Sequence, residues 1–110
     1  MKTLHIHLKT ENLDQSVTYY SALFDRRPTK LELDYAQWRL DDPRANISVS
    51  TRTGAGGVDH AGISFDSNEE LEEAASRLRA IENALAPEKN ATCCYAKSDK
   101  YWSTDPQSVV

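Results

Sequence analysis

The sequence lacks any run of basic residues. Its 110 residues include 13 Lys and Arg against 17 Asp and Glu, which gives a formal net charge of -4. Proteins that bind nucleic acid neutralise its phosphate backbone with clustered Lys and Arg. This charge pattern therefore argues against nucleic acid as a partner.

Long apolar stretches are also missing. No segment approaches the roughly 20 apolar residues that a membrane-spanning helix needs. The first nine residues alternate between apolar and polar, unlike the continuous apolar region of a signal peptide. We therefore expect no membrane partner and a cytoplasmic protein, and a chain of this length is expected to form one domain.

Cysteine is scarce, and the two cysteines are neighbours, Cys93 and Cys94. Adjacent Cα atoms lie about 3.8 Å apart, closer than ordinary disulfide geometry permits, so no disulfide framework and no oxidising compartment are indicated. Thiolates at these positions would favour thiophilic ions such as Zn(II), Cd(II), Cu(I) or trivalent arsenic. The alternative is two half-buried strand cysteines, because adjacent side chains of a regular strand point to opposite faces.

Two segments of the chain show the same pattern of a strand followed by a helix. Residues 4–8 alternate, which predicts a strand with His5 and His7 on the face away from the core. Residues 59–65 alternate in the same way and place His60 on the corresponding face. The pattern therefore predicts two related units in which His5 and His60 are equivalent.

Capping residues mark the helix of each unit. Asn12 and Gln15 predict a helix over about Leu13–Phe24, and Ser67 and Glu70 predict a second helix. Residues 86–87, Ala-Pro, are expected to end the second helix.

Short strands are expected to follow each helix. In the first half they are Lys30–Leu33, Tyr35–Leu40 and Asn46–Ser50, and in the second half only Ala91–Ala96 and Lys100–Thr104. Residues 53–57 lack the Lys and Ser or Thr of a phosphate loop and are interpreted as a linker. The expected fold is α+β, one domain over residues 1–110, with module one at about 1–52 and module two at about 58–110. Module one is β-α-β-β-β, and module two lacks the last strand.

Two equivalent histidines suggest a metal site. If the modules pack about a pseudo-twofold axis, His5 and His60 share a cleft, and neutral imidazole suits Fe(II), Zn, Ni, Mn or Co. A solvated surface histidine is the alternative for each. Gly62 occupies the position that matches His7, so His7 is expected to line the cleft rather than to bind the metal.

The motifs resemble a known superfamily. Residues 5–8, 19–24 and 58–63 are similar to the vicinal oxygen chelate superfamily, which comprises glyoxalases, bleomycin-resistance proteins and extradiol dioxygenases. Residues 92–96, 99–102 and 104–106 resemble the cadmium-induced proteins and the carbon–arsenic lyases, which cleave trivalent organoarsenicals.

This resemblance implies Fe(II) on His5, His60 and a glutamate of the final strand. Fe(II) is therefore the first choice of metal, followed by Zn, Ni or Mn from the chemistry of imidazole ligands. The resemblance also implies that Cys93 and Cys94 bind arsenic. Apart from the resemblance, His7, Tyr95 and Lys100 are expected to lie in the cleft, with packing as the alternative for the aromatic residue. Where the family continues with a glycine turn and the glutamate strand, this chain reads Gln-Ser-Val-Val at residues 107–110. We therefore expect a truncated second module, an incomplete site, and a homodimer in which strand or module exchange covers the gap.

The residues leave the function open among three possibilities. The first is a metal-dependent lyase or dioxygenase-like enzyme that acts on thiophilic organometalloids. The second is a non-catalytic protein that sequesters a metal, a metalloid or a small hydrophobic compound. The third is a truncated paralogue without retained activity.

Overall fold

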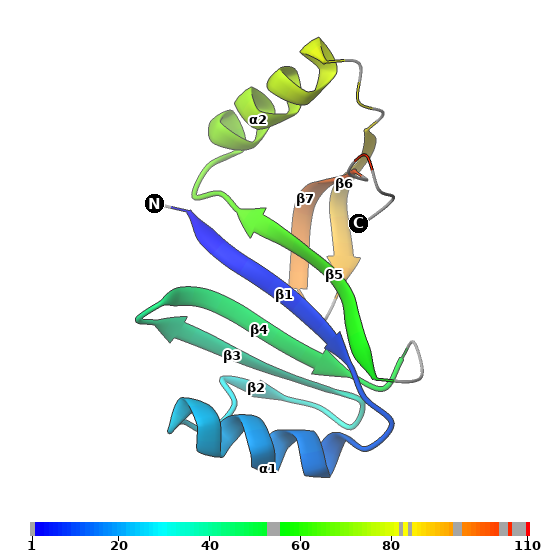
Figure 1. The fold of residues 1–110 in the computed structure, drawn as a ribbon. Coiled ribbons are helices and arrows are strands. Elements are labelled where there is room, and N and C mark those ends of the chain that lie inside the picture. The colour runs from blue at the N-terminus through cyan, green and yellow to red at the C-terminus, as the bar shows by residue number, and fades with distance from the viewer. Residues whose placement is uncertain are drawn as a thin grey trace. The chain divides into compact units, whose positions relative to one another are not determined.

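The structure, a computed structural model, describes residues 2–52, 56–81, 83, 85–93, 96–103, 106 and 110, and describes only the backbone of 86–93 and 96–99. The elements, drawn in Figure 1, are β1 (Thr3–Lys9), α1 (Leu13–Phe24), β2 (Lys30–Leu31), β3 (Tyr35–Asp41), β4 (Arg44–Ser50), β5 (Gly57–Ser64), α2 (Asn68–Ala80), β6 (Ala86–Cys93) and β7 (Ala96–Trp102). They form two compact units, residues 2–64 and 65–110.

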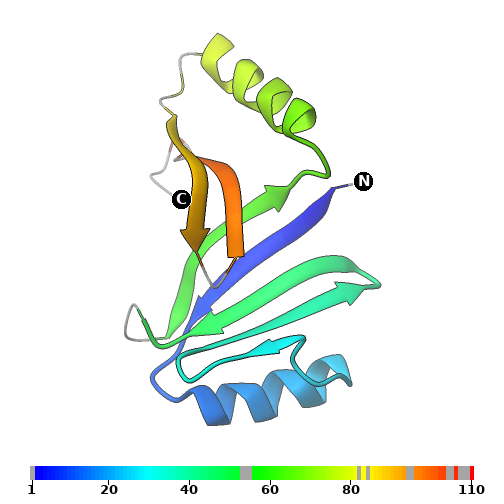
Figure 2. The same cartoon turned by 180° about the vertical axis from the view of Figure 1, so that it is seen from behind.

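The first unit contains a five-stranded mixed sheet with the order β2-β3-β4-β1-β5, which can be followed in Figures 1 and 2. Strand β4 lies between β3 and β1; it runs antiparallel to β3 and parallel to β1. Strand β5 is antiparallel to β1. The α+β class and the β-α-β-β-β order of the first half are therefore confirmed, and the arrangement of the chain as two such modules stays a prediction.

Helix α1 covers one face of this sheet (Figure 1). The buried core between them consists of Leu13, Ala36, Trp38 and Val49. The rings of Tyr20 and Phe24 lie 5.9 and 5.8 Å from the Trp38 ring, measured between centroids. Trp38 is the largest fully buried side chain of the described residues, so α1 is held mainly by apolar and aromatic packing.

The ends of α1 are fixed by hydrogen bonds, as the capping residues predict. The Asn12 Oδ1 atom accepts a hydrogen bond of 3.0 Å from the Gln15 backbone N–H. The helix ends at Phe24, and Asp25 adopts a left-handed backbone conformation with φ 51°.

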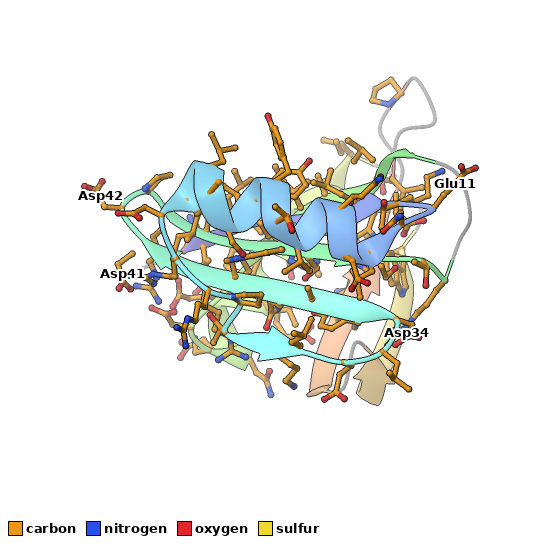
Figure 3. All side chains as sticks on the ribbon, turned by 90° about the horizontal axis from the view of Figure 1, so that it is seen from below. Glu11, Asp34, Asp41 and Asp42 are labelled. Carbon is orange, nitrogen blue, oxygen red and sulfur yellow. The ribbon has the colours of Figure 1, made fainter. Side chains whose placement is uncertain are left out.

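Acidic side chains lie around the helical layer rather than inside it. Figure 3 shows Glu11 and Asp34 toward one end of α1 and Asp41 and Asp42 toward the other. The Arg26 guanidinium, just after α1, lies 4.0 Å from the Asp41 carboxylate. Both groups are largely exposed to solvent, so this ion pair adds little to stability.

The second unit contains α2 and the β6–β7 hairpin. The Ser67 Oγ atom accepts a hydrogen bond of 3.2 Å from the Glu70 N–H, which confirms the second predicted helix start. Tyr101 of β7 contacts α2 twice. Its hydroxyl donates to the Glu72 carboxylate at 2.7 Å, and its ring lies 5.3 Å from the Arg79 guanidinium.

The end predicted for the second helix is wrong. Helix α2 stops at Ala80, and the backbone N–H groups of Ile81 and Asn83 both donate to the Leu78 carbonyl, at 3.2 and 3.0 Å. These bonds close the last turn before the chain reaches Ala86, which begins β6 and pairs with β7. Pro87, the next residue, is compatible with β6 because both strands of a two-stranded hairpin are edge strands.

The strand predicted over Ala91–Ala96 is also wrong. Strand β6 ends at Cys93 and β7 begins at Ala96, and these two residues pair with each other. The predicted segment is thus divided between the two strands of a hairpin. Among the described residues, no helix is long and apolar enough to cross a membrane.

Candidate metal site

Three histidines converge on the face of the first unit's sheet that is opposite α1. His5 and His7 alternate along β1 with the residues that face the helix, and His60 of β5 is the cross-strand partner of His7. The ligand atoms of all three side chains lie within 4.8 Å of one another. Ring centroids are separated by 5.3 Å between His5 and His60, and by 5.1 Å between His7 and His60.

The pairing of β1 with β5 has a local twofold symmetry. His5 pairs with Gly62, and His7 pairs with His60. Exchanging the two strands converts the first pair into the second, because His5 takes the place of His60 and Gly62 takes the place of His7. His5 and His60 therefore occupy equivalent positions within this strand pair, as the repeat predicts.

His60 is oriented by its sequence neighbour. Its Nδ1 atom lies 2.7 Å from the Asp59 carboxylate. The register shifts between His7 and Leu8, which pair with His60 and Val58, so Asp59 is the additional residue of a β-bulge. A bulge redirects side chains, which explains how adjacent residues of one strand come into contact. This contact occupies Nδ1, so Nε2 would be the ring nitrogen that holds a metal.

The His7 side chain contacts a buried serine of the neighbouring strand β4. Its Nε2 atom lies 2.8 Å from the Ser50 Oγ atom, and Ser50 is fully buried in β4. Burial, together with the nearby His60 imidazole, lowers the pKa of His7 from 6.5 to about 4. His7 is therefore neutral at physiological pH, which is the form that binds metals.

Two further buried residues form the floor beside His7. The Tyr35 hydroxyl and the Ser48 Oγ atom lie 2.9 Å apart, and neither residue is exposed. The Tyr35 ring is edge-on to the His7 ring at 6.1 Å between centroids. The Arg52 guanidinium lies 5.2 Å from the Tyr35 ring centroid and binds the Asp34 carboxylate at 3.0 Å. These residues pack next to His7, and Ser50 contacts its ring by a hydrogen bond.

The three imidazoles fit a divalent metal ion. Neutral imidazole suits Zn, Fe, Ni and Cu, and a ligand histidine whose other nitrogen contacts a carboxylate or hydroxyl is the usual supporting arrangement. His60 and His7 both have this arrangement, through Asp59 and Ser50. In the part of the chain that the structure describes, the cluster consists of histidines alone.

The other predicted site residues belong to the second unit. Cys93 is the last residue of β6, where only the backbone is described, and Cys94 and Tyr95 lie outside the described residues. Lys100 lies in β7, and its Nζ atom is 5.4 Å from the Trp102 ring centroid. The proposed contact between these residues and a metalloid thus stays a prediction.

Sequence reasoning missed Asp59 and Ser50 as site residues. The Asp-His dipeptide was a local signal for the first, because a carboxylate beside a ligand histidine is a common supporting partner. Ser50 gave no such signal. It is 43 residues from His7, and only the pairing of β1 with β4 brings the two together.

Comparison with known proteins gives related sequences and a related fold. No protein-family model matches. The chain is 40% identical to a trivalent organoarsenical cleaving enzyme of Bacillus sp. strain MD1, over 96% of this chain and 68% of the relative. It is 33% identical to a probable trivalent organoarsenical cleaving enzyme of Bacillus subtilis, over 96% and 74%. It is 30% identical to the cadmium-induced protein CadI of Mycobacterium tuberculosis, over 96% and 70%.

A solved structure of similar fold is among the matches. It is described as an NAD-dependent benzaldehyde dehydrogenase from Legionella pneumophila, and the match has a TM-score of 0.61 and 15% identity over 96% of this chain and 92% of that one. At this identity the likeness concerns the fold alone. The sequence relatives, in contrast, each align with more than two thirds of their own length. The chain therefore belongs to the family of the trivalent organoarsenical cleaving enzymes and the cadmium-induced protein CadI.

Proposed function

We propose that this chain is a metal-dependent enzyme of the vicinal oxygen chelate superfamily that cleaves trivalent organoarsenicals. Its metal ligands in this proposal are His5, His7 and His60. The observation that carries the proposal is the convergence of these three imidazoles, with ligand atoms within 4.8 Å of one another. The names of the relatives supply the substrate class.

The chain's own residues prepare the site for a cation. His7 is neutral because its pKa is lowered to about 4, so no proton has to be displaced from it near pH 7. Asp59 and Ser50 fix the rings of His60 and His7, which reduces the entropy lost on binding. Fe(II) is the first choice, followed by Zn, Ni or Mn. When bound, such an ion would supply a Lewis-acid centre at which dioxygen or substrate is activated.

Cys93 and Cys94 would bind the substrate's arsenic. Thiolates are soft ligands, and trivalent arsenic is a thiophilic centre, whereas imidazole and water bind it weakly. Tyr95 and Lys100 are proposed to line the same cleft. In this proposal the imidazoles bind the metal and the thiolates bind the metalloid.

Loss of a trivalent aryl arsenical in the presence of Fe(II) tests the activity. Wild type is expected to consume the arsenical, and His60→Ala and Cys94→Ser are expected to leave it intact, because one removes a metal ligand and the other an arsenic ligand. A wild-type protein that binds Fe(II) and the arsenical but does not release the aryl group from arsenic would contradict the enzymatic proposal.

Sequestration without turnover is the second candidate. It is favoured by the relation to a cadmium-induced protein and by a cluster that, in the described residues, has no carboxylate ligand. In that case the same assay would give stoichiometric binding of arsenical or Cd(II), lost in Cys94→Ser, with no product in any variant.

The role of Ser50 can be separated from that of its neighbour Ser48. Both serines are fully buried in β4, but Ser50 contacts His7 and Ser48 contacts Tyr35. Ser50→Ala is expected to weaken metal binding by roughly 10- to 100-fold, the usual effect of losing a partner of a ligand histidine. Ser48→Ala should leave metal affinity unchanged. Calorimetric titration with Zn(II) measures both, and equal affinities in the two variants would contradict the assignment.

A further inference from the structure

The local twofold symmetry of the site is broken at one position. Four residues occupy neighbouring positions on the same face of β1 and β5: the pair His5 and Gly62, and the pair His7 and His60. These four positions are called corners, and three of them carry an imidazole. The fourth carries a glycine, and it is the position that the twofold relates to His7.

Among the described residues of the first unit, no atom fills the space next to this fourth corner. A Cβ atom placed on Gly62 would meet no heavy atom within 4 Å apart from its chain neighbours, among the residues that the structure describes. Gly62 does not have a positive φ, in contrast to Gly57 with φ 122°. Strand geometry therefore does not require glycine here, since other residues adopt this backbone without strain.

The absence of a side chain at Gly62 would leave one side of a bound ion open. Three imidazoles approach from His5, His7 and His60, so an ion that they hold is left with an open side above Gly62. The three imidazoles bind as neutral ligands and the Asp59 carboxylate beside His60 supplies one negative charge, so the site would still carry a net positive charge with a divalent ion bound. Such a centre favours an anionic ligand in its open position.

We propose that Gly62 is the entry corner of the metal site, over which a small anionic ligand such as a thiolate or azide reaches the metal. This inference rests on the proposed metal site and specifies which side of it is open. Gly62 acts by leaving room; it contributes no ligand atom of its own.

The proposal can be tested with the full chain loaded with Co(II), whose absorption spectrum reports each added ligand. The variants are Gly62→Val, which fills the corner with a residue well suited to strands, and Ser64→Val as the matched control. Ser64 lies two residues further along the same face of β5 and pairs with Thr3 instead of a histidine. Azide is the probe.

Gly62→Val is expected to bind one Co(II) with wild-type affinity and to bind azide about tenfold or more weakly, because the valine methyl groups block the approach. Ser64→Val should bind azide like wild type. Equal azide affinities in wild type and Gly62→Val, with Co(II) bound in both, would overturn the inference alone. Failure of the wild type to bind Co(II) would overturn the metal site itself.

A second variant tests the same corner by adding a metal ligand there instead of an apolar side chain. Because Gly62 is equivalent to His7, Gly62→His should add a fourth imidazole and close the site. Its Co(II) spectrum is expected to differ from that of wild type before azide is added and to stay unchanged afterwards. A spectrum that still responds to azide like wild type would contradict the placement of the entry corner at Gly62.

Discussion

Replacement of His60 by Ala is expected to reduce the affinity for Zn(II) or Co(II) by more than about 100-fold. Loss of a partner that merely orients a ligand already weakens binding by roughly 10- to 100-fold, and loss of the ligand itself should exceed that. The His60 ring lies close to both other imidazoles, with ring centroids 5.3 Å from His5 and 5.1 Å from His7. Without it, β5 contributes no histidine to the cluster. Isothermal titration of the full chain gives the affinity.

Asp59→Asn provides the graded control for this prediction. Asparagine keeps an oxygen that can accept from His60 Nδ1 but removes the negative charge, so its effect on metal affinity should fall between wild type and His60→Ala. Both variants should unfold at nearly the wild-type denaturant concentration, because the histidine cluster is not part of the apolar core. A His60→Ala protein that binds Zn(II) like wild type would eliminate the proposed ligand set.

The largest effect on stability is expected for Trp38→Ala. Trp38 is fully buried beneath α1, contacts the rings of Tyr20 and Phe24, and donates its indole N–H to the Arg26 carbonyl at 3.2 Å. Truncation of a buried tryptophan removes this packing and leaves a cavity, which typically costs about 3–5 kcal/mol. That is a large part of the free energy of unfolding of a small domain. Urea denaturation followed by circular dichroism measures the loss.

Two variants keep this prediction testable if Trp38→Ala does not fold. Trp38→Phe retains an aromatic ring and should be destabilised less. Leu33→Ala truncates an apolar side chain that is fully exposed, and its free energy of unfolding should stay within about 0.5 kcal/mol of wild type. A Trp38→Phe variant as stable as Leu33→Ala would contradict the role given to Trp38.

The first half of the chain could be predicted well because its signals are local. The Asn12 capping residue, the helical spacing that follows, and the alternation around His5 and His7 each depend on residues within about one turn or a few strand positions. The structure has the same helix bounds, Leu13–Phe24, and places both histidines opposite the helix. Local patterns of this kind survive folding because tertiary packing reinforces them.

The supporting residues of the site could not be predicted in the same way. Alternation would place the side chains of Asp59 and His60 on opposite faces, but the β-bulge at Asp59 brings them into contact. The contact of Ser50 with His7 depends on the parallel pairing of β4 with β1, which no local pattern encodes. For the same reason His7, assigned to the cleft from sequence, is a ligand in the proposal made from the structure.

The errors in the second half have a different physical cause. Residues 86–87 carry a proline, and proline ends helices but is equally compatible with an edge strand. Here it lies in β6, and α2 ends earlier through hydrogen bonds to the Leu78 carbonyl. Because proline is compatible with both a helix end and an edge strand, its presence does not show which of the two is formed.

Imidazole resonances offer the most direct test of the metal site, because the chain contains only three histidines. Two-dimensional ¹H–¹⁵N spectra of the ring nitrogens, recorded during titration with Zn(II), would follow His5, His7 and His60 individually. All three are expected to change together and to stop changing at one equivalent of metal, with His60 bound through Nε2 and His7 through Nδ1. Saturation with the His7 resonances unchanged would contradict the three-histidine site.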